Sequence, residues 1–125
     1  MARGPQEIEA AFANAKTEAA GAVVVQASLA SKAAADMAIK HDLPAATVPR
    51  SFAEAGGLLS YGADSSTSFR QSARFVTKIL QGGRPADMPV EQPTKFELVI
   101  NLKTAKALGL PVAETFLQRA DAIIE

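Results

Sequence analysis

The stretch Ser51-Phe-Ala-Glu-Ala-Gly-Gly-Leu-Leu-Ser-Tyr-Gly62 joins a helical turn to a short apolar strand. Ser51 is a good N-cap and Glu54 follows three residues later, as a capping box requires, so a helical turn is predicted over 51–55. Gly56-Gly57 ends that turn, because a residue without Cβ enters positive φ at little cost. Leu58 to Tyr61 is then predicted to be a buried strand, which Gly62 stops. A passage of this kind between layers or lobes is a natural edge for a ligand.

Upstream of this stretch, the pattern predicts two more strands separated by a helix. A helix is expected from Pro5 to about Ala19, and the β-branched run Ala22–Gln26 is typical of a strand buried on both faces. A helix over 31–41, capped by Ser28 or Ser31, leads to a strand over 45–48. Strand, helix and strand with tight links form a βαβ unit, which predicts a parallel sheet.

Downstream, the longest predicted helix covers 66–81 and is apolar on more than one side, through Phe69, Phe75, Val76, Ile79 and Leu80. Such a helix predicts more than one packing partner. A strand over 95–101, a short helix over 104–108 and a last helix from Pro111 follow, the last with Phe116, Leu117, Ala120, Ile123 and Ile124 facing inward. The chain is therefore predicted to be a single α/β domain over 1–125, with a mainly parallel sheet flanked by helices.

The composition narrows the classes of partner. The chain has 125 residues, with 13 Lys and Arg against 13 Asp and Glu, so its net charge is zero. A neutral surface argues against a nucleic-acid or anionic-membrane partner. The sequence has no cysteine and no apolar run long enough to span a bilayer. Its first residues, Met1-Ala-Arg-Gly-Pro-Gln, lack an apolar signal core, so the chain as written is expected to stay in the cytoplasm.

Four residues are candidates for ligand contacts. Gln26 and Ser28 follow one predicted strand and Arg50 follows the next, at the edge where parallel α/β sheets bind ligands. Two interpretations remain open for these positions: ligand binding, or helix capping by the serines and a solvated arginine. Tyr61, the sole tyrosine, is either half-buried in a strand or placed at a lobe junction where it stacks on a ligand.

Metal binding, cofactor binding and catalysis find little support in the sequence. His41 is the sole histidine, and no second ligand-type residue stands at metal-binding spacing from it, which favours a structural role. Neither Gly56-Gly57 nor Gly82-Gly83 has the context of a phosphate-binding loop. No nucleophile is accompanied by a base, so no enzyme is predicted and no cofactor is expected.

Several segments closely resemble one known family, that of the ABC-transporter substrate-binding proteins, some of which are associated with aromatic amino acid uptake. The resemblance is strongest over Pro85-Ala-Asp-Met-Pro-Val-Glu-Gln-Pro-Thr-Lys-Phe-Glu-Leu-Val-Ile-Asn-Leu-Lys-Thr-Ala-Lys-Ala-Leu-Gly-Leu110. It extends to Lys40-His-Asp-Leu-Pro44, Phe52–Gly62, Lys78-Ile-Leu-Gln-Gly82 and Arg119-Ala-Asp-Ala-Ile-Ile-Glu125.

The resemblance implies a type I periplasmic binding protein, in which two α/β lobes close on a small ligand such as an amino acid and deliver it to an ABC permease. This chain looks like the C-terminal portion, and residues 63–91 would by analogy pack on the first lobe. The full-length relative is expected to be periplasmic or membrane-anchored outside the cytoplasm. The alternative is a free-standing α/β module that self-associates as a homodimer through the surface that the first lobe would cover.

Overall fold

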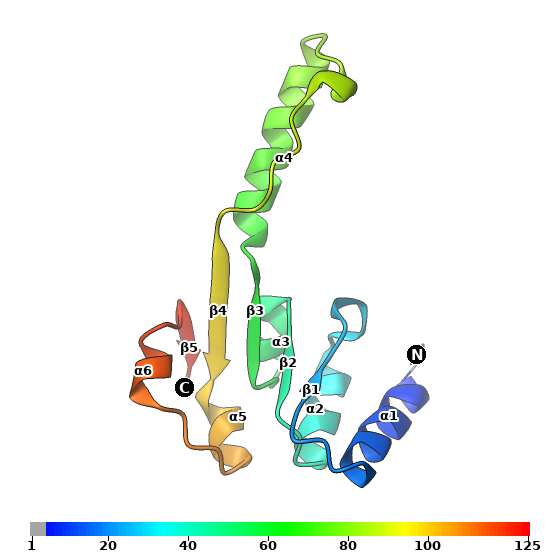
Figure 1. Ribbon diagram of the computed structural model, residues 1–125, viewed down its shortest axis with the longest axis vertical. Helices are drawn as coiled ribbons and strands as arrows, with labels where there is room; N and C mark the ends of the chain where they lie inside the picture. The colour runs from blue at the N-terminus through cyan, green and yellow to red at the C-terminus, as the bar shows by residue number, and fades with distance from the viewer. Residues whose placement is uncertain (1–4) are drawn as a thin grey trace. The chain divides into compact units, whose positions relative to one another are not determined.

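The computed structural model describes residues 5–125, with side chains from Glu7 onward, and shows five strands in one sheet flanked by helices (Figure 1). The helices are α1 (Pro5–Thr17), α2 (Lys32–Lys40), α3 (Arg50–Glu54), α4 (Ser65–Leu80), α5 (Leu102–Ala107) and α6 (Glu114–Leu117). The strands are β1 (Val23–Val24), β2 (Ala45–Thr47), β3 (Leu59–Ala63), β4 (Phe96–Asn101) and β5 (Ala122–Ile124). Two short 3-10 helices cover Ala27–Leu29 and Pro85–Asp87.

The sheet has the order β1-β2-β3-β4-β5 and is mostly parallel. β1 pairs with β2, β2 with β3, and β4 with β5 in the parallel sense. The N–H of Asn101 at the end of β4 donates to the carbonyl of Leu58 at the start of β3, so these two neighbours run in opposite directions. The predicted α/β class with a mainly parallel sheet is confirmed.

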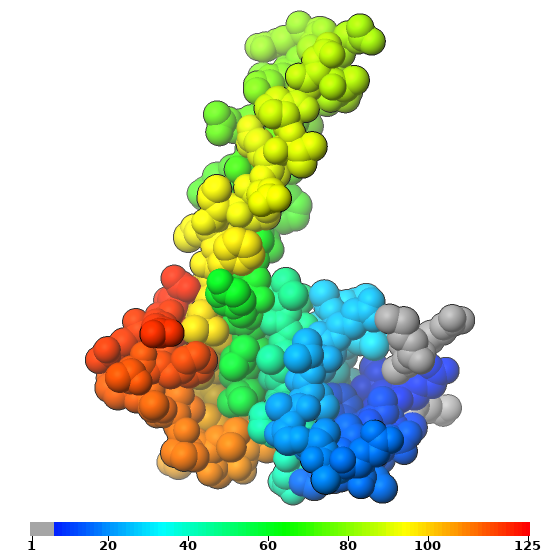
Figure 2. All heavy atoms as spheres, in the orientation of Figure 1, coloured from blue at the N-terminus to red at the C-terminus, as the bar shows by residue number. Residues whose placement is uncertain are grey.

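The chain divides into two compact units. The first, here called the sheet unit, comprises Met1–Gly62 and Glu97–Glu125; the second, the α4 unit, comprises Ala63–Phe96. The packing of residues 63–91 on a further lobe stays a prediction. In the sheet unit, α1 (blue) and the segment of α5 and α6 (orange) lie at opposite ends of the sheet (Figure 2).

One core cluster of the sheet unit lies on the face of the sheet under α1, α2 and α3, and on β4 the successive residues Val99 and Ile100, which point to opposite faces, are both buried. The buried residues of the cluster are mostly small, with two aromatic rings among them: Phe12, Ala34, Ala35, Ala38, Leu43, Ala45 and Phe52. Val23 and Val25 pack against this cluster, whereas Val24 between them points to the other face and is 87% exposed. The prediction that Ala22–Gln26 is buried on both faces is therefore wrong. The helices packed against this strand cover one side of it, and successive side chains alternate in direction.

The stretch 51–62 differs from its prediction in two details. The helical turn begins one residue early, as α3, with Pro49 at the N-cap position and no side-chain cap. The capping box of Ser51 and Glu54 is therefore wrong, because the Glu54 carboxylate instead accepts a hydrogen bond from Arg50 four residues before it, at 2.7 Å. Gly56 ends the turn at φ +111, as predicted.

Gly62 does not stop its strand but continues β3 to Ala63. A Cβ atom built at Gly62 would lie 2.5 Å from Cγ1 and 2.7 Å from the carbonyl oxygen of Val48. Both distances are far below van der Waals contact, and a backbone carbonyl cannot move aside cheaply. Glycine is therefore required here by close approach and not by a turn.

We expect Gly62→Ala to lower the free energy of unfolding by about 1–3 kcal/mol, because the added methyl group forces the backbone after β2 away from β3. Urea denaturation monitored by circular dichroism measures the change. Gly21→Ala is the matched control, since a Cβ there meets no atom within 4 Å. Equal unfolding midpoints for the two variants would contradict the argument.

The C-terminal segment is also different from its prediction. The helix expected from Pro111 is limited to the four residues of α6, and Ala122–Ile124 forms β5 beside β4. Asp121 fixes the start of this strand: its N–H donates to the carbonyl of Leu98 at 2.9 Å, and its carboxylate accepts from the N–H of Leu98 at 2.8 Å. The β-branched pair Ile123-Ile124 suits an extended strand better than a helix.

In the α4 unit, helix α4 carries large apolar side chains that the described chain leaves open. Phe69 is 75% exposed and Leu80 83% exposed, and Val76 and Ile79 are also exposed. Within the part of the chain that the structure describes, no residue of α4 is buried. Despite these side chains, neither α4 nor any other helix among residues 5–125 has the length and hydrophobicity needed to cross a bilayer.

Candidate functional site

The carboxyl ends of β1, β2 and β3 lie at one edge of the sheet, because the three strands are parallel. We call this the carboxyl edge, made of residues 25–29 after β1, 48–50 after β2 and 61–62 in the last part of β3. The Thr47 hydroxyl donates to the carbonyl of Val25 at 2.6 Å, which ties the ends of β1 and β2 together. Parallel α/β sheets bind their ligands at this edge.

Gln26 and Ser28 lie together in the turn after β1, and both are exposed. The Gln26 carbonyl accepts the N–H of Leu29, which closes the 3-10 turn. Ser28 does not cap α2; Ser31 does, through a hydrogen bond from the N–H of Ala34. Gln26 also borders an apolar hollow of about 230 Å³ beside β1, lined further by Ile8, Ala11, Phe12, Val23, Val24, Val25 and Leu29.

Tyr61 lies on β3 with its side chain 57% exposed. Its neighbours Ser60 and Gly62 are buried, so Tyr61 points to the opposite face of the strand from them. Ser60 pairs with Thr47 on β2, and Thr47 lies two residues after the core residue Ala45, so the three side chains are on the same face of the sheet. The buried face of β3 is therefore the face that α1–α3 cover. Tyr61 is therefore on the face that these helices leave open.

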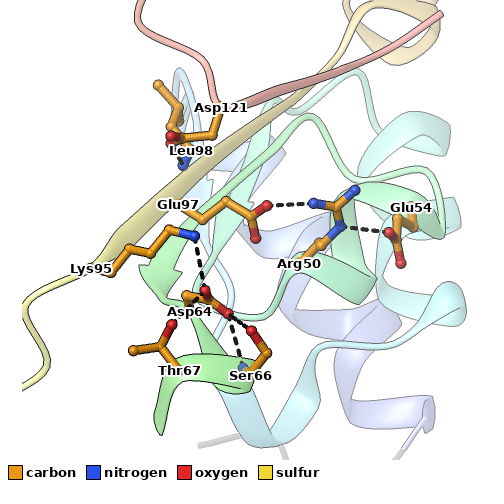
Figure 3. A network of polar contacts seen from close by, with 9 residues as sticks. All are labelled: Arg50, Glu54, Asp64, Ser66, Thr67, Lys95, Glu97, Leu98 and Asp121. Atoms are coloured by element: carbon orange, nitrogen blue, oxygen red, sulfur yellow. Dashed lines mark hydrogen bonds and ion pairs between the residues drawn. The ribbon is translucent and has the colours of Figure 1, made fainter. Parts of the chain in front are cut away.

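Arg50 begins α3 and is held between two carboxylates (Figure 3). Its Nε donates to Glu54 at 2.7 Å and its Nη1 donates to Glu97 on β4. The hydrogen bond with Glu54, and then the charge of Glu97, raise the pKa of Arg50 above its ordinary value. The Asn101 side chain, four residues after Glu97 on the same strand, donates to the carbonyl of Ala53 in α3, so Glu97 and Arg50 meet on the α3 side of the sheet.

The structure thus brings Gln26 and Ser28 together but does not bring all four candidates to one face. Tyr61 and the Arg50 guanidinium share the carboxyl edge and lie on opposite faces of the sheet. Two residues of this region, Glu54 and Glu97, were not among the candidates. Glu54 follows Arg50 by four residues, which is the spacing at which ion pairs form on a helix, so the sequence could have predicted this pair. Glu97 is 47 residues from Arg50, and no local pattern predicts that they meet.

A second polar cluster belongs to the α4 unit and surrounds Asp64, the N-cap of α4 (Figure 3). One carboxylate oxygen accepts from the N–H and hydroxyl of Ser66, at 2.9 and 2.8 Å, and the other accepts from Thr67 at 2.9 Å. Lys95 lies 3.2 Å from the second oxygen, and the Asp64 N–H donates to the Lys95 carbonyl at 3.0 Å. These hydrogen bonds, from Ser66 first, hold the pKa of Asp64 well below its usual range.

The lowered pKa predicts how this cluster depends on pH. Asp64 ionises at an ordinary value near 3.8 when its partners are absent, so its stabilisation of the start of α4 is complete above that pH. It is lost as the pH falls below 3.8 towards the lowered pKa of the folded chain. We expect the amide signal of Ser66, followed by NMR from pH 6 downward, to titrate with a midpoint well below 3.8. In Asp64→Asn this titration should disappear, and a wild-type midpoint at or above 3.8 would contradict the assignment.

His41 caps the C-terminus of α2, and its Nε2 is buried without a hydrogen-bond partner in the described structure. Among residues 5–125, no three His, Cys, Asp or Glu side chains are grouped so that they could hold a metal ion.

A mostly parallel sheet with helices packed on it, and a ligand-type edge at its strand ends, defines the class of an α/β fold. The chain belongs to the ABC transporter substrate binding protein family, whose model matches residues 1–124. A search of curated proteins found no match.

Solved structures agree on the fold. The chain is similar to a conserved domain protein from Vibrio cholerae, with 24% identity and a TM-score of 0.86 over 98% of this chain. It is similar to an ABC domain in complex with L-Trp from Streptococcus pneumonia, with 24% identity and a TM-score of 0.84 over 97% of this chain. A ligand-free, open substrate binding protein with adhesive properties from Clostridium difficile is 19% identical, with a TM-score of 0.69 over 98%. The chain covers 42%, 43% and 42% of these three chains respectively, less than half of each.

Proposed function

We propose that residues 1–125 act as part of a two-lobed solute-binding protein that delivers a small organic ligand, such as an amino acid, to an ABC permease. The observation that carries the proposal is the family match over residues 1–124. The similar Streptococcus structure holds L-Trp, which supports an amino acid as the ligand class. The proposed role is binding without catalysis, in an extracytoplasmic compartment.

The carboxyl edge is the proposed ligand surface of this part of the protein. Gln26 and Ser28 offer an amide and a hydroxyl for hydrogen bonds, and Tyr61 offers an exposed aromatic ring. Arg50, the fourth candidate, begins α3 at the same edge. An edge of one sheet buries too little of a small ligand to hold it tightly, because ligand sites enclose most of the ligand surface. Residues 1–125 alone are therefore expected to bind weakly or not at all.

Calorimetry on a two-lobed chain that includes residues 1–125, titrated with L-tryptophan and a panel of other amino acids, tests the proposal. We expect at least one of them to bind, and Tyr61→Ala to weaken that binding by roughly tenfold, about the free energy of one aromatic contact. Val90→Ala, at an exposed position of the α4 unit, is the control. Unchanged affinity in Tyr61→Ala would remove Tyr61 from the site, and no binding across the panel would count against an amino acid ligand.

A second candidate function is a self-associating α/β module, and one observation favours it. The exposed large apolar side chains of α4, Phe69, Val76, Ile79 and Leu80, fall within one half of the helix circumference by helical spacing. Contiguous exposed apolar surface of this kind commonly marks an interface. The proposed partner of residues 1–125 is a second copy of the chain in a symmetric homodimer.

A further inference from the structure

The ion pair between Arg50 and Glu97 crosses a strand. Arg50 follows β2 and Glu97 lies on β4, and β3 lies between these two strands in the sheet. The hydrogen bond from Asn101 to Leu58 sets the register of β3 against β4. Counting four residues back along β4 and four forward along β3 places Glu97 opposite Gly62. The Arg50–Glu97 pair therefore passes over the one position of β3 that has no side chain in its way.

A second observation concerns the same place. Gly62 approaches the Val48 carbonyl so closely that a Cβ atom would lie 2.7 Å from it. Val48 and Pro49 are the whole link between β2 and Arg50, the first residue of α3, so the glycine lets the segment Val48–Arg50 lie directly on β3. The segment Val48–Arg50 is therefore held in two ways: Val48 packs closely on Gly62 of β3, and Arg50 pairs with Glu97 of β4.

The arginine has little freedom to do anything else. Its Nε and Nη1 already donate to Glu54 and Glu97, which oppose its single positive charge with two negative ones. A ligand carboxylate would have to compete with both of these partners. The guanidinium also lies on the α3 side of the sheet, away from the face on which Tyr61 is exposed.

We infer that Arg50 is a positioning residue and not a ligand contact: through Glu97 it holds the link Val48–Arg50 and the start of β4 in place at the carboxyl edge. This inference rests on the proposed function, because the edge it shapes is the proposed ligand surface. Glu54 fixes the direction of the guanidinium so that it meets Glu97.

We call the Arg50–Glu97 pair, in its role of holding this link to β4, the brace. Hydrogen exchange on residues 1–125 without ligand tests the brace independently of ligand binding. Arg50→Gln and Glu97→Gln should each lower the protection of the amides of Phe52 and Leu98 by about threefold, the size expected for a half-exposed ion pair. The double variant should lose no more than either single one, because both changes break the same pair. Arg50→Lys, which keeps a cation, should recover part of the protection, and Lys103→Gln on α5 should change nothing. Unchanged protection in Arg50→Gln, or additive losses in the double variant, would overturn the inference.

Binding of L-tryptophan to the two-lobed chain separates the brace from a direct contact. If Arg50 acts through Glu97, both single variants weaken binding equally, and the double variant weakens it no further. If Arg50 holds the ligand, Glu97→Gln leaves binding unchanged or strengthens it, and Arg50→Gln still weakens it in that background; that pattern would overturn the inference. If no variant and no wild-type chain binds L-tryptophan, the proposed ligand is wrong, while the exchange measurement still decides whether the brace exists.

Discussion

Phe52→Ala should destabilise the chain more than any other change considered, by about 3–5 kcal/mol in the free energy of unfolding. Phe52 is 1% exposed, and its ring fills the core between α3 and the small residues of α2. Its place is also fixed by Gly57, where a Cβ atom would lie 2.1 Å from the ring. Removing the ring leaves a cavity whose rigid walls cannot close. The loss of stability therefore exceeds the transfer free energy of the removed atoms alone.

Urea denaturation of Phe52→Ala and Phe116→Ala measures this difference under the same conditions. Phe116 is the matched control, because it loses the same atoms from a side chain that is 40% exposed. We expect the control to lose about 1 kcal/mol or less. Since a domain of this size has a total stability of roughly 5–15 kcal/mol, Phe52→Ala should unfold at markedly lower urea. Equal losses in the two variants would show that the ring is not central to the core.

The second large effect is expected on association. Residues 1–125 at micromolar concentration should sediment as a dimer, at twice the chain mass of 13.0 kDa. Each large apolar side chain of α4 that is buried by the partner contributes roughly 1.5–3 kcal/mol. A single glutamate at Ile79 loses that contribution and buries a charge besides, so Ile79→Glu should raise the dissociation constant by a hundredfold or more.

Arg74→Glu is the control for charge on the same helix. By helical spacing, Arg74 lies on the opposite side of α4 from Phe69, Val76, Ile79 and Leu80, and it is exposed. We expect Arg74→Glu to remain a dimer at the concentration at which Ile79→Glu is a monomer. A wild-type chain that sediments as a monomer would refute the self-association, and a two-lobed chain that is monomeric would indicate that the α4 surface is covered within one molecule.

The elements with strong local signals could be predicted from the sequence, and those set by distant partners could not. The helix predicted over 66–81 is present as α4 within one residue at each end, and the positive φ of Gly56 was also predicted, because both follow from local sequence chemistry. The strand Ala122–Ile124 was taken for a helix, because three residues are too few to show a period, and its partner β4 lies some twenty residues away. The N-cap of α3 was predicted at Ser51 and lies at Pro49. Glu54 could pair with either Ser51 or Arg50, and in the structure it accepts its hydrogen bond from the charged Arg50.

The candidate site shows the same division. The position of Gln26, Ser28, Arg50 and Tyr61 near the carboxyl ends of parallel strands followed from the order of the elements. Which face each side chain takes depends on register, and the sequence carries no signal for the pairing of Glu97 with Arg50, 47 residues before it. Gly62 was expected to stop a strand, and it proved to be the place where two backbone segments touch.

The alanines of the core limit how this protein can change over evolutionary time. Ala34, Ala35, Ala38 and Ala53 are almost completely enclosed, so each methyl group sets the spacing between a helix and its neighbours. A larger side chain at any of them must push two backbones apart, which costs more than repacking flexible side chains. Bulkier residues can enter this interior where a neighbouring one shrinks in the same step. Substitutions among these positions should therefore be correlated between related sequences, and a library that varies one alanine at a time should return almost none of the larger residues.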